Sequence, residues 1–210
     1  MDCIQINQVV KRFRSFAALD HITISFEQGK IHGIIGRNGS GKTVLFKCIC
    51  GFMYPEEGEI LVGGKRIGKD CSIAENVGII IENPGFLPNY SGYKNLLFLA
   101  GLSQEVRKER IREVLRLVGL DQAGNKHVSK YSMGMRQRLG IAQAIMEDPS
   151  ILILDEPMNG LDNQGVEDMR KLFLKLKEEG KTILIASHNK EDIAALCDTV
   201  IEMDHGKIIE

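Results

Sequence analysis

The residues most able to do chemistry lie in one glycine-rich stretch, Gly-Arg-Asn-Gly-Ser-Gly-Lys-Thr, at residues 36–43. Its spacing matches G-x-x-x-x-G-K-[ST], the pattern of a loop that binds phosphate groups. Glycines let successive backbone N–H groups turn inward around an anion, and the N-terminus of the following helix adds positive potential. We expect Lys42 to reach the β- and γ-phosphates of a nucleotide and Thr43 to offer its hydroxyl to Mg²⁺.

The segments on either side of this stretch support the same interpretation. A short apolar run at residues 31–35 leads into it, and residues 44–49 are expected to form a helix that leads out. A glycine-rich turn between a strand and a helix, with an exposed lysine, is the alternative. The candidate phosphate-binding residues are Gly36, Arg37, Asn38, Gly39, Ser40, Gly41, Lys42 and Thr43.

Two adjacent carboxylates follow another strongly apolar segment, Ile-Leu-Ile-Leu at residues 151–154. Successive side chains at a strand end point to opposite faces, so Asp155 and Glu156 can take different roles. We expect Asp155 to hold Mg²⁺ and Glu156 to act as the general base on an attacking water. A helix N-cap or a charge at the edge of a strand is the alternative.

The elements that must position these residues are predicted to be strands of a largely buried sheet. Residues 151–154 and 182–186 are apolar on both faces, which is typical of strands in the middle of a parallel sheet. Ile22, Ile24 and Phe26 alternate with polar residues, which indicates a half-buried strand.

Helical periodicity appears between and after these strands. Residues 106–118, 132–146 and 164–179 each predict a helix, and glycines follow the first and the last of them. Residues 83–149 lack strand signals, whereas strand-rich segments lie on both sides. We therefore expect an α/β core at residues 1–82 and 150–210 with an inserted helical subdomain.

The composition excludes several classes of protein. Lys and Arg number 27 and Asp and Glu number 28, so the net charge is −1 and a general nucleic-acid-binding surface is not expected. The five scattered cysteines form no C-x-x-C pair, which favours free thiols in a reducing compartment. No apolar run approaches the roughly 18 residues of a membrane span, and the first residues do not form a signal peptide. We expect a soluble chain unless a partner anchors it.

A second motif, Tyr-Ser-Met-Gly-Met-Arg-Gln-Arg, lies at residues 131–138. With the motifs above, it resembles the ATP-binding cassette (ABC) ATPases over essentially the whole chain. Ser132 and Gly134 match the serine and second glycine of the family's Leu-Ser-Gly-Gly-Gln signature, whereas Met133 and Met135 depart from it. The resemblance implies that Ser132 and Gly134 contact the γ-phosphate of ATP held by the opposite subunit. A Ser132 that is only a helix N-cap is the alternative.

The same resemblance implies roles for two further polar residues. Asp162, in Met-Asn-Gly-Leu-Asp at residues 158–162, matches the acid of the family's D-loop. It could equally be the N-cap of the following helix, and both roles can hold together. His188 follows a predicted strand and matches the family's switch histidine, which hydrogen-bonds the γ-phosphate and orders the attacking water.

An aromatic residue near the N-terminus has a counterpart in the family. Phe13, in Lys-Arg-Phe at residues 11–13, matches the aromatic residue that stacks on adenine, a contact that needs only a flat ring face. Phe16 is the second candidate for this role. Either ring could instead belong to the core.

One position departs from the family in a way that concerns the metal. The family usually has glutamine after the strand that precedes the helical insertion, whereas Glu82 follows Ile-Ile-Ile at residues 79–81. Its carboxylate can approach Mg²⁺ or the water, and it adds a negative charge near the phosphates. An exposed loop carboxylate is the alternative. With its signature and D-loop sequences, the chain resembles the branch that exports, or gives resistance to, antimicrobial peptides such as lantibiotics and bacitracin.

The resemblance implies a P-loop NTPase core with a mostly parallel sheet, helices and additional antiparallel strands at the N-terminus. It implies an ATPase with the cofactors ATP and Mg²⁺ that works as a head-to-tail homodimer or heterodimer of ATPase subunits. It also implies a separate membrane permease subunit, which would hold the chain at the cytoplasmic face of the membrane. The permease is expected to dock beside residues 82–93, and a packed loop covering the insertion is the alternative. The apolar residues that would suit this docking are Phe86, Leu87, Pro88 and Tyr90.

Two other classes of protein explain less of the sequence. A soluble ABC ATPase that acts in DNA or ribosome metabolism is the main alternative. However, the stretch between Lys42 and Ser132 holds no heptads of a long coiled coil, and the chain contains one cassette. A small P-loop kinase would leave the signature motif and His188 unexplained.

Overall fold

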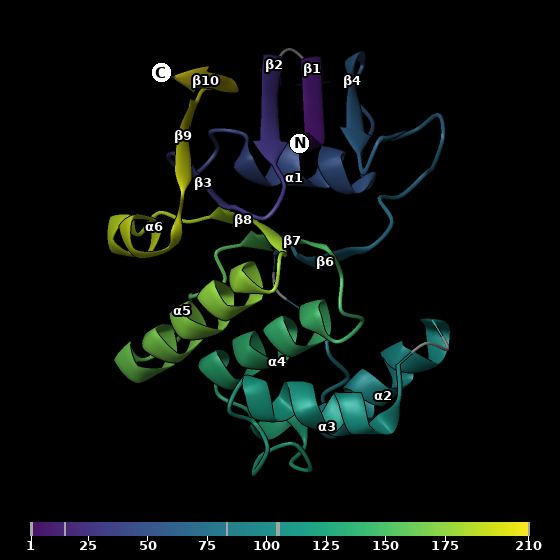
Figure 1. Cartoon of the computed structure of the whole chain (residues 1–210), viewed down its shortest axis with the longest axis vertical. Coiled ribbons are helices and arrows are strands. Elements are labelled where there is room, and N and C mark those ends of the chain that lie inside the picture. The colour runs from purple at the N-terminus through teal and green to yellow at the C-terminus, as the bar shows by residue number, and fades with distance from the viewer. Residues whose placement is uncertain (1, 15, 83, 104–105, 210) are drawn as a thin grey trace.

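The elements form layers around two β-sheets, with α1 between the sheets and the remaining long helices below the second one (Figure 1). The computed structural model describes residues 2–14, 16–82, 84–103 and 106–209. Residues 1, 83 and 210, at the limits of the predicted core and helical subdomain, lie outside the described residues.

The first sheet is antiparallel and carries the half-buried strand predicted from alternation. Its strands are β1 (Asp2–Phe13), β2 (Phe16–Glu27), β4 (Glu57–Val62) and β5 (Lys65–Arg66), in the order β2-β1-β4-β5. In β1, Ile6 lies opposite Ile24 on one side and Ile60 on the other. Ile22 and Phe26 of β2 are buried, because every second side chain faces the core. The expected antiparallel strands at the N-terminus are thus confirmed.

The second sheet is almost entirely parallel. It contains β3 (Ile31–Ile35), β6 (Val77–Ile80), β7 (Ile151–Asp155), β8 (Thr182–Ala186), β9 (Thr199–Asp204) and β10 (Lys207–Ile209), in the order β10-β9-β3-β8-β7-β6. Among the described strands of this second sheet, only β10 runs antiparallel to its neighbour, β9. Almost every residue of β3, β7 and β8 is buried, as the two-sided apolar pattern predicts.

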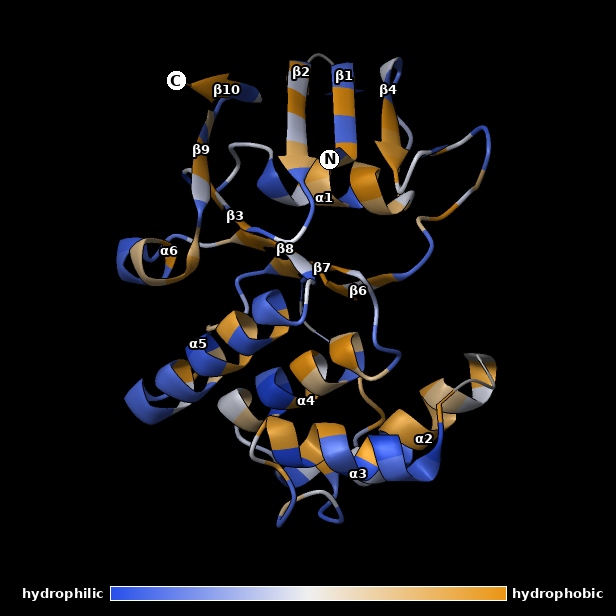
Figure 2. Ribbon diagram, in the orientation of Figure 1, coloured by the Kyte–Doolittle hydropathy of each residue, from blue (hydrophilic) through white to orange (hydrophobic). Residues whose placement is uncertain are grey.

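Helices cover both faces of this second sheet. On one face, α1 (Lys42–Cys50) buries Leu45, Phe46 and Ile49 in a core shared with the first sheet. On the other face lie α4 (Met133–Ile145) and α5 (Asn163–Glu178), with α2 (Gly92–Ser103) and α3 (Lys108–Leu117) farther out. The short α6 (Lys190–Leu196) lies beside β9 in the view of Figure 1. Figure 2 shows hydrophobic residues along β3, β6, β7 and β8 of the second sheet, and alternating hydrophobic and hydrophilic residues along α5.

The predicted helices differ from the observed ones only near their ends. The helix expected at residues 106–118 begins at Lys108, so Val106 precedes it. Ser132 and Asp162 are the N-caps of α4 and α5, respectively. Between β6 and β7, the described residues form helices and no strand. None of the helices in the described ranges is both long enough and apolar enough to cross a membrane.

We predict that the stability of the fold depends on pH through His32, which is buried in β3. Its Nε2 lies 2.8 Å from the carbonyl oxygen of Glu27 and its Nδ1 lies 2.6 Å from the hydroxyl of Thr199. Burial lowers the pKa of His32 below its usual value. Between that folded pKa and about 6.5, the unfolded chain binds a proton that the folded chain does not. The free energy of unfolding therefore decreases as the pH is lowered through this range, by up to about 1.4 kcal/mol per pH unit.

Denaturant titrations at several pH values between 7.5 and 5.5 measure this slope. His32→Gln should reduce the slope, whereas His205→Gln, which changes an exposed histidine, should not. An unchanged slope in His32→Gln would assign the pH dependence to other groups.

Candidate active site

The predicted phosphate loop, residues 36–43, joins β3 to α1 and can be built only with glycine at two points. Gly36 and Gly41 have φ angles of +149° and +110°. A Cβ on Gly36 would lie 2.2 Å from the carbonyl oxygen of Met203, and one on Gly41 would lie 2.4 Å from that of Ala18. The loop is therefore pressed against β2 and β9, with the N-terminus of α1 at its end, where N–H groups lack intrahelical partners.

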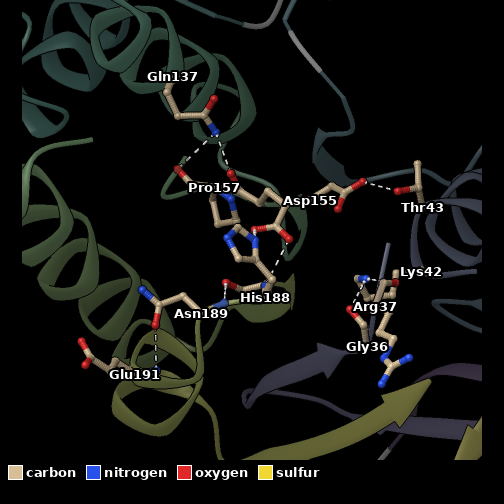
Figure 3. Close-up of polar contacts among 12 residues, drawn as sticks. Gly36, Arg37, Lys42, Thr43, Gln137, Asp155, Pro157, His188, Asn189 and Glu191 are labelled. Carbon is tan, nitrogen blue, oxygen red and sulfur yellow. Dashed lines mark hydrogen bonds and ion pairs between the residues drawn. The ribbon is translucent and has the colours of Figure 1, made fainter. Parts of the chain in front are cut away.

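Lys42 turns back over this loop. The side chain is buried, and its Nζ donates to the carbonyl oxygen of Gly36 at 2.7 Å and to that of Arg37 at 3.1 Å (Figure 3). Its positive charge thus lies beside the residues predicted to bind phosphate. Gly39 has open space at its Cβ position. The buried Ser40 hydroxyl has no hydrogen-bond partner in the described part of the chain.

Thr43 and Asp155 meet although 112 residues separate them. The Thr43 hydroxyl donates to Asp155 Oδ2 at 2.7 Å, which joins the start of α1 to the end of β7 (Figure 3). Hydroxyl and carboxylate oxygens are ligands that Mg²⁺ prefers. Among the described residues, no group of three or more His, Cys, Asp or Glu side chains could hold a metal. The site thus fits an Mg²⁺ ion that takes its other ligands from phosphate and water.

Glu156 and His188 are direct partners at the ends of β7 and β8. The backbone N–H of His188 donates to Glu156 Oε1 at 3.1 Å, and its Nδ1 lies 2.8 Å from Oε2. Glu156 itself has φ +51°, a left-handed conformation that costs free energy in a residue with a side chain. Its N–H donates to the carbonyl oxygen of Ala186 at 2.8 Å, which holds it in this conformation. The two predicted catalytic residues therefore form one unit.

A cavity of about 980 Å³ brings most of the predicted residues together. Its lining includes Lys42, Thr43, Asp155, Glu156, Glu82, Asn38, Gly39, Gly41, Phe13 and Phe16. Phe13 and Phe16 are both exposed, so neither ring belongs to the core. The Nζ of Lys11 lies 5.7 Å from the centre of the Phe13 ring. Stacking of adenine on one of these rings remains a prediction.

The signature motif and the D-loop contact each other at the N-termini of two helices. Ser132 accepts from the N–H of Met135 at 3.2 Å, and Asp162 accepts from the N–H of Gly165 at 2.8 Å. A Cβ on Gly134 would lie 2.6 Å from the carbonyl oxygen of Gly160. The N-cap role is thus real for both residues. Within the described ranges, Ser132, Gly134, Asp162 and the predicted catalytic His188 do not line the cavity. Met133 and Asn159, from the same two motifs, do line it.

Glu82 lines the cavity but has a basic partner that the sequence did not indicate. Its Oε1 lies 2.5 Å from the Nζ of Lys47, on α1. The Glu82 side chain is 65% exposed and that of Lys47 is 23% exposed. The predicted role of Glu82 as a metal ligand therefore competes with this ion pair.

Gln137 is a further residue that sequence reasoning missed. Its side chain is buried, and its Nε2 donates to the carbonyl oxygens of Glu156 at 3.3 Å and Pro157 at 3.1 Å (Figure 3). It thereby ties α4 to the segment that follows β7. Gln137 lies inside the motif at residues 131–138, but no local pattern indicated a separate role for it.

A groove, also of about 980 Å³, lies on the other side of the segment that contains Glu82, and polar side chains such as Asn95, Gln143 and Glu147 share its lining with apolar ones. Its apolar lining includes Phe52, Pro84, Phe86, Leu87, Phe98, Leu99 and Leu102. Of the four residues expected at the docking surface, Phe86 and Leu87 line the groove. Within the described chain, Pro88 and Tyr90 do not, although the Tyr90 ring packs edge-on against Phe98 with centroids 5.0 Å apart.

Comparison with known proteins identifies the family. Residues 19–159 match the family described as ABC transporter. The chain is 43% identical over 205 residues to the uncharacterized ABC transporter ATP-binding protein YybJ of Bacillus subtilis, covering 98% of this chain and 94% of that protein. It is 41% identical over 209 residues to the bacitracin transport ATP-binding protein BcrA of Bacillus licheniformis, covering 99% and 68%.

A solved structure supports the same fold. The crystal structure of a nucleotide-free ATP-binding cassette from an ABC transporter matches with a TM-score of 0.86 at 26% identity, covering 100% of this chain and 90% of that one. Together with the parallel second sheet and the helices between β6 and β7, this match confirms the predicted fold class.

We predict that changing two glycines of the phosphate loop to alanine has different effects on stability and on ADP binding. Gly41→Ala should lower the melting temperature, because its Cβ would overlap a backbone oxygen of β2. Gly39→Ala meets no protein atom and should cost about 1–2 kcal/mol from its left-handed backbone, but its methyl group would occupy the cavity and weaken ADP binding. Thermal unfolding and calorimetric titration separate the effects. Equal losses of stability in both variants would contradict this account of the loop.

Proposed function

The chain belongs to the ABC transporter family, and on that premise we propose that it binds Mg-ATP in the cavity between the phosphate loop and β7. Hydrolysis to ADP and phosphate would drive a separate membrane permease. One observation carries the proposal. Lys42, the Thr43–Asp155 contact and Glu156 line one cavity, and Glu156 is paired with His188 at the carboxyl ends of neighbouring strands.

The residues of the loop would bind and neutralise the triphosphate. Lys42 exchanges its two carbonyl contacts for oxygens of the β- and γ-phosphates, and the N–H groups at residues 39–43 donate to the same groups. Thr43 and Asp155 would hold Mg²⁺, which supplies positive charge toward the phosphate oxygens when bound. Phe13 or Phe16 supplies a flat surface for adenine.

Glu156 would act as the general base. It accepts a proton from water as the water oxygen bonds to the γ-phosphorus and the bond to the bridging oxygen of ADP breaks. Two contacts from His188 orient the Glu156 carboxylate. His188 is not among the described residues that line the cavity. Its contact with the γ-phosphate would be made through Nε2, the ring nitrogen that is not paired with Glu156.

A second ATPase subunit would complete the site. ABC cassettes dimerise, and Ser132 and Gly134 are not among the residues that line the cavity of their own chain, although Met133 between them is. In a head-to-tail dimer they would contact the γ-phosphate of the partner's nucleotide, at the positive end of α4. Asp162 caps the adjoining α5 and would keep this surface in place.

The permease would dock in the groove lined by Phe86 and Leu87, which gives the chain a place at the cytoplasmic face of the membrane. Leu102 is 83% exposed and Phe52, Leu87 and Phe98 are each about half exposed, an unusual concentration of apolar surface. Similarity to BcrA supports an antimicrobial peptide as the cargo.

We predict that Glu156→Gln keeps ATP binding and stops turnover. An amide cannot accept the proton of the water, so phosphate release should fall about 10²- to 10⁴-fold, while the ATP-bound dimer accumulates on gel filtration. Lys42→Ala is the contrasting variant, because it should lose tight ATP binding and form no such dimer. Hydrolysis by Glu156→Gln at the wild-type rate would show that another group is the base.

We predict that a charged residue in the groove prevents the permease from binding. Leu87→Asp should abolish co-purification of a polytopic membrane protein from detergent-solubilised membranes of the source cell, because a buried unpaired carboxylate is costly. Leu174→Asp is the matched control, since it changes a partly exposed leucine of α5 that lies away from the groove. Retention of the membrane protein by both variants would remove this groove as the docking site.

A further inference from the structure

The ion pair between Lys47 and Glu82 joins two segments that both border the nucleotide cavity. Lys47 lies in the last turn of α1, the helix that starts with Lys42 and Thr43 of the phosphate loop. Glu82 follows β6 and lines the cavity together with Thr43 and Asp155. The distance of 2.5 Å between Nζ and Oε1 makes this a direct hydrogen-bonded ion pair.

Glu82 brings a third carboxylate to a cavity that must accept a polyanion. Asp155 accepts a hydrogen bond from Thr43, and Glu156 is held by His188. Without a cation at its own carboxylate, Glu82 would repel the phosphates of a nucleotide in the same cavity. Lys47 is the only lysine or arginine in the described chain with an ion pair to Glu82.

The backbone around Glu82 also restricts where its carboxylate can lie. Glu82 has φ +63°, a conformation that a residue with a side chain seldom adopts. Two residues later, Pro84 lines both the nucleotide cavity and the groove that contains Phe86 and Leu87. A Cβ on Gly140 of α4 would lie 2.7 Å from the ring of Pro84, so this segment lies tightly against α4.

We propose that Lys47 is the positioning residue for Glu82: it holds the carboxylate at the end of α1 and neutralises its charge toward the bound nucleotide. This inference rests on the proposed nucleotide site. The Glu82 carboxylate would separate from Lys47 only when a stronger positive charge, such as Mg²⁺ bound with the nucleotide, competes for that carboxylate. The pair therefore sets how strongly nucleotide binding depends on Mg²⁺.

The test is a double-mutant cycle of Lys47→Met and Glu82→Gln, with ADP affinity measured by calorimetry in EDTA and in excess Mg²⁺. In EDTA, Lys47→Met should weaken ADP binding about three- to fivefold, the scale of a partly exposed charge pair. Glu82→Gln alone should change it less than twofold, because Lys47 already neutralises the carboxylate that is removed. In the double variant, the affinity should equal that of Glu82→Gln, because Lys47 does not itself line the cavity and then has no carboxylate to hold.

Two controls separate the effect of the Lys47 charge on ADP binding from any effect of the substitution on the stability of the fold. Lys47→Arg keeps the positive charge and should bind ADP within twofold of the wild type, a margin set by the usual scatter of surface substitutions. Methionine keeps the unbranched stem and helix propensity of lysine, so the melting temperature of Lys47→Met should change little. Raising the salt concentration should shrink the effect of Lys47→Met in EDTA.

An equal loss of ADP affinity from Lys47→Met in the Glu82 and Glu82→Gln backgrounds would overturn the proposal, as would no loss in either. Its failure can be told apart from failure of the proposed function. If the wild-type protein binds no ADP, or Lys42→Ala binds it as well as the wild type does, the nucleotide site itself is wrong. If those two results hold and the cycle shows no coupling, only the role of Lys47 is wrong.

Discussion

The shared direction and register of β3, β8 and β7 is the constraint on which the site depends. Ala186, at the end of β8, lies opposite Ile34 on one side and Asp155 on the other. Because the three strands end at the same edge, the phosphate loop, the two carboxylates and His188 all emerge there. This is the general location of ligand sites in parallel α/β sheets. A shift of one residue in β7 would turn Asp155 away from Thr43.

The site must also hold several carboxylates next to a place for phosphates. The structure meets this requirement by giving each carboxylate its own partner: a hydroxyl for Asp155, a histidine for Glu156 and an ammonium group for Glu82. The buried Lys42 and the N-terminus of α1 supply the positive potential that remains. Compensation is therefore local, which is consistent with a chain whose net charge is only −1.

Contacts of α4 connect the site to the helices on the far side of the second sheet. Gln137 binds the two carbonyls that follow β7, and Gly134 packs on the D-loop. Near its other end, Gly140 packs on Pro84, which borders both the cavity and the groove. The single helix α4 thus contacts the segment that holds Glu156, the D-loop and the segment that borders the groove. It offers a contiguous physical connection between the candidate active site and the groove proposed for docking.

The sequence alone determined the phosphate loop, the carboxylate pair, the α/β fold and the approximate helices, because glycine spacing and apolar periodicity are local properties. Tertiary structure decided the rest. Lys47 and Glu82 are 35 residues apart, and Glu156 and His188 are 32 apart. No local pattern encodes such distances; they follow from how strands align and helices pack. The groove was likewise only half predicted, since Phe52 comes to it from the end of α1.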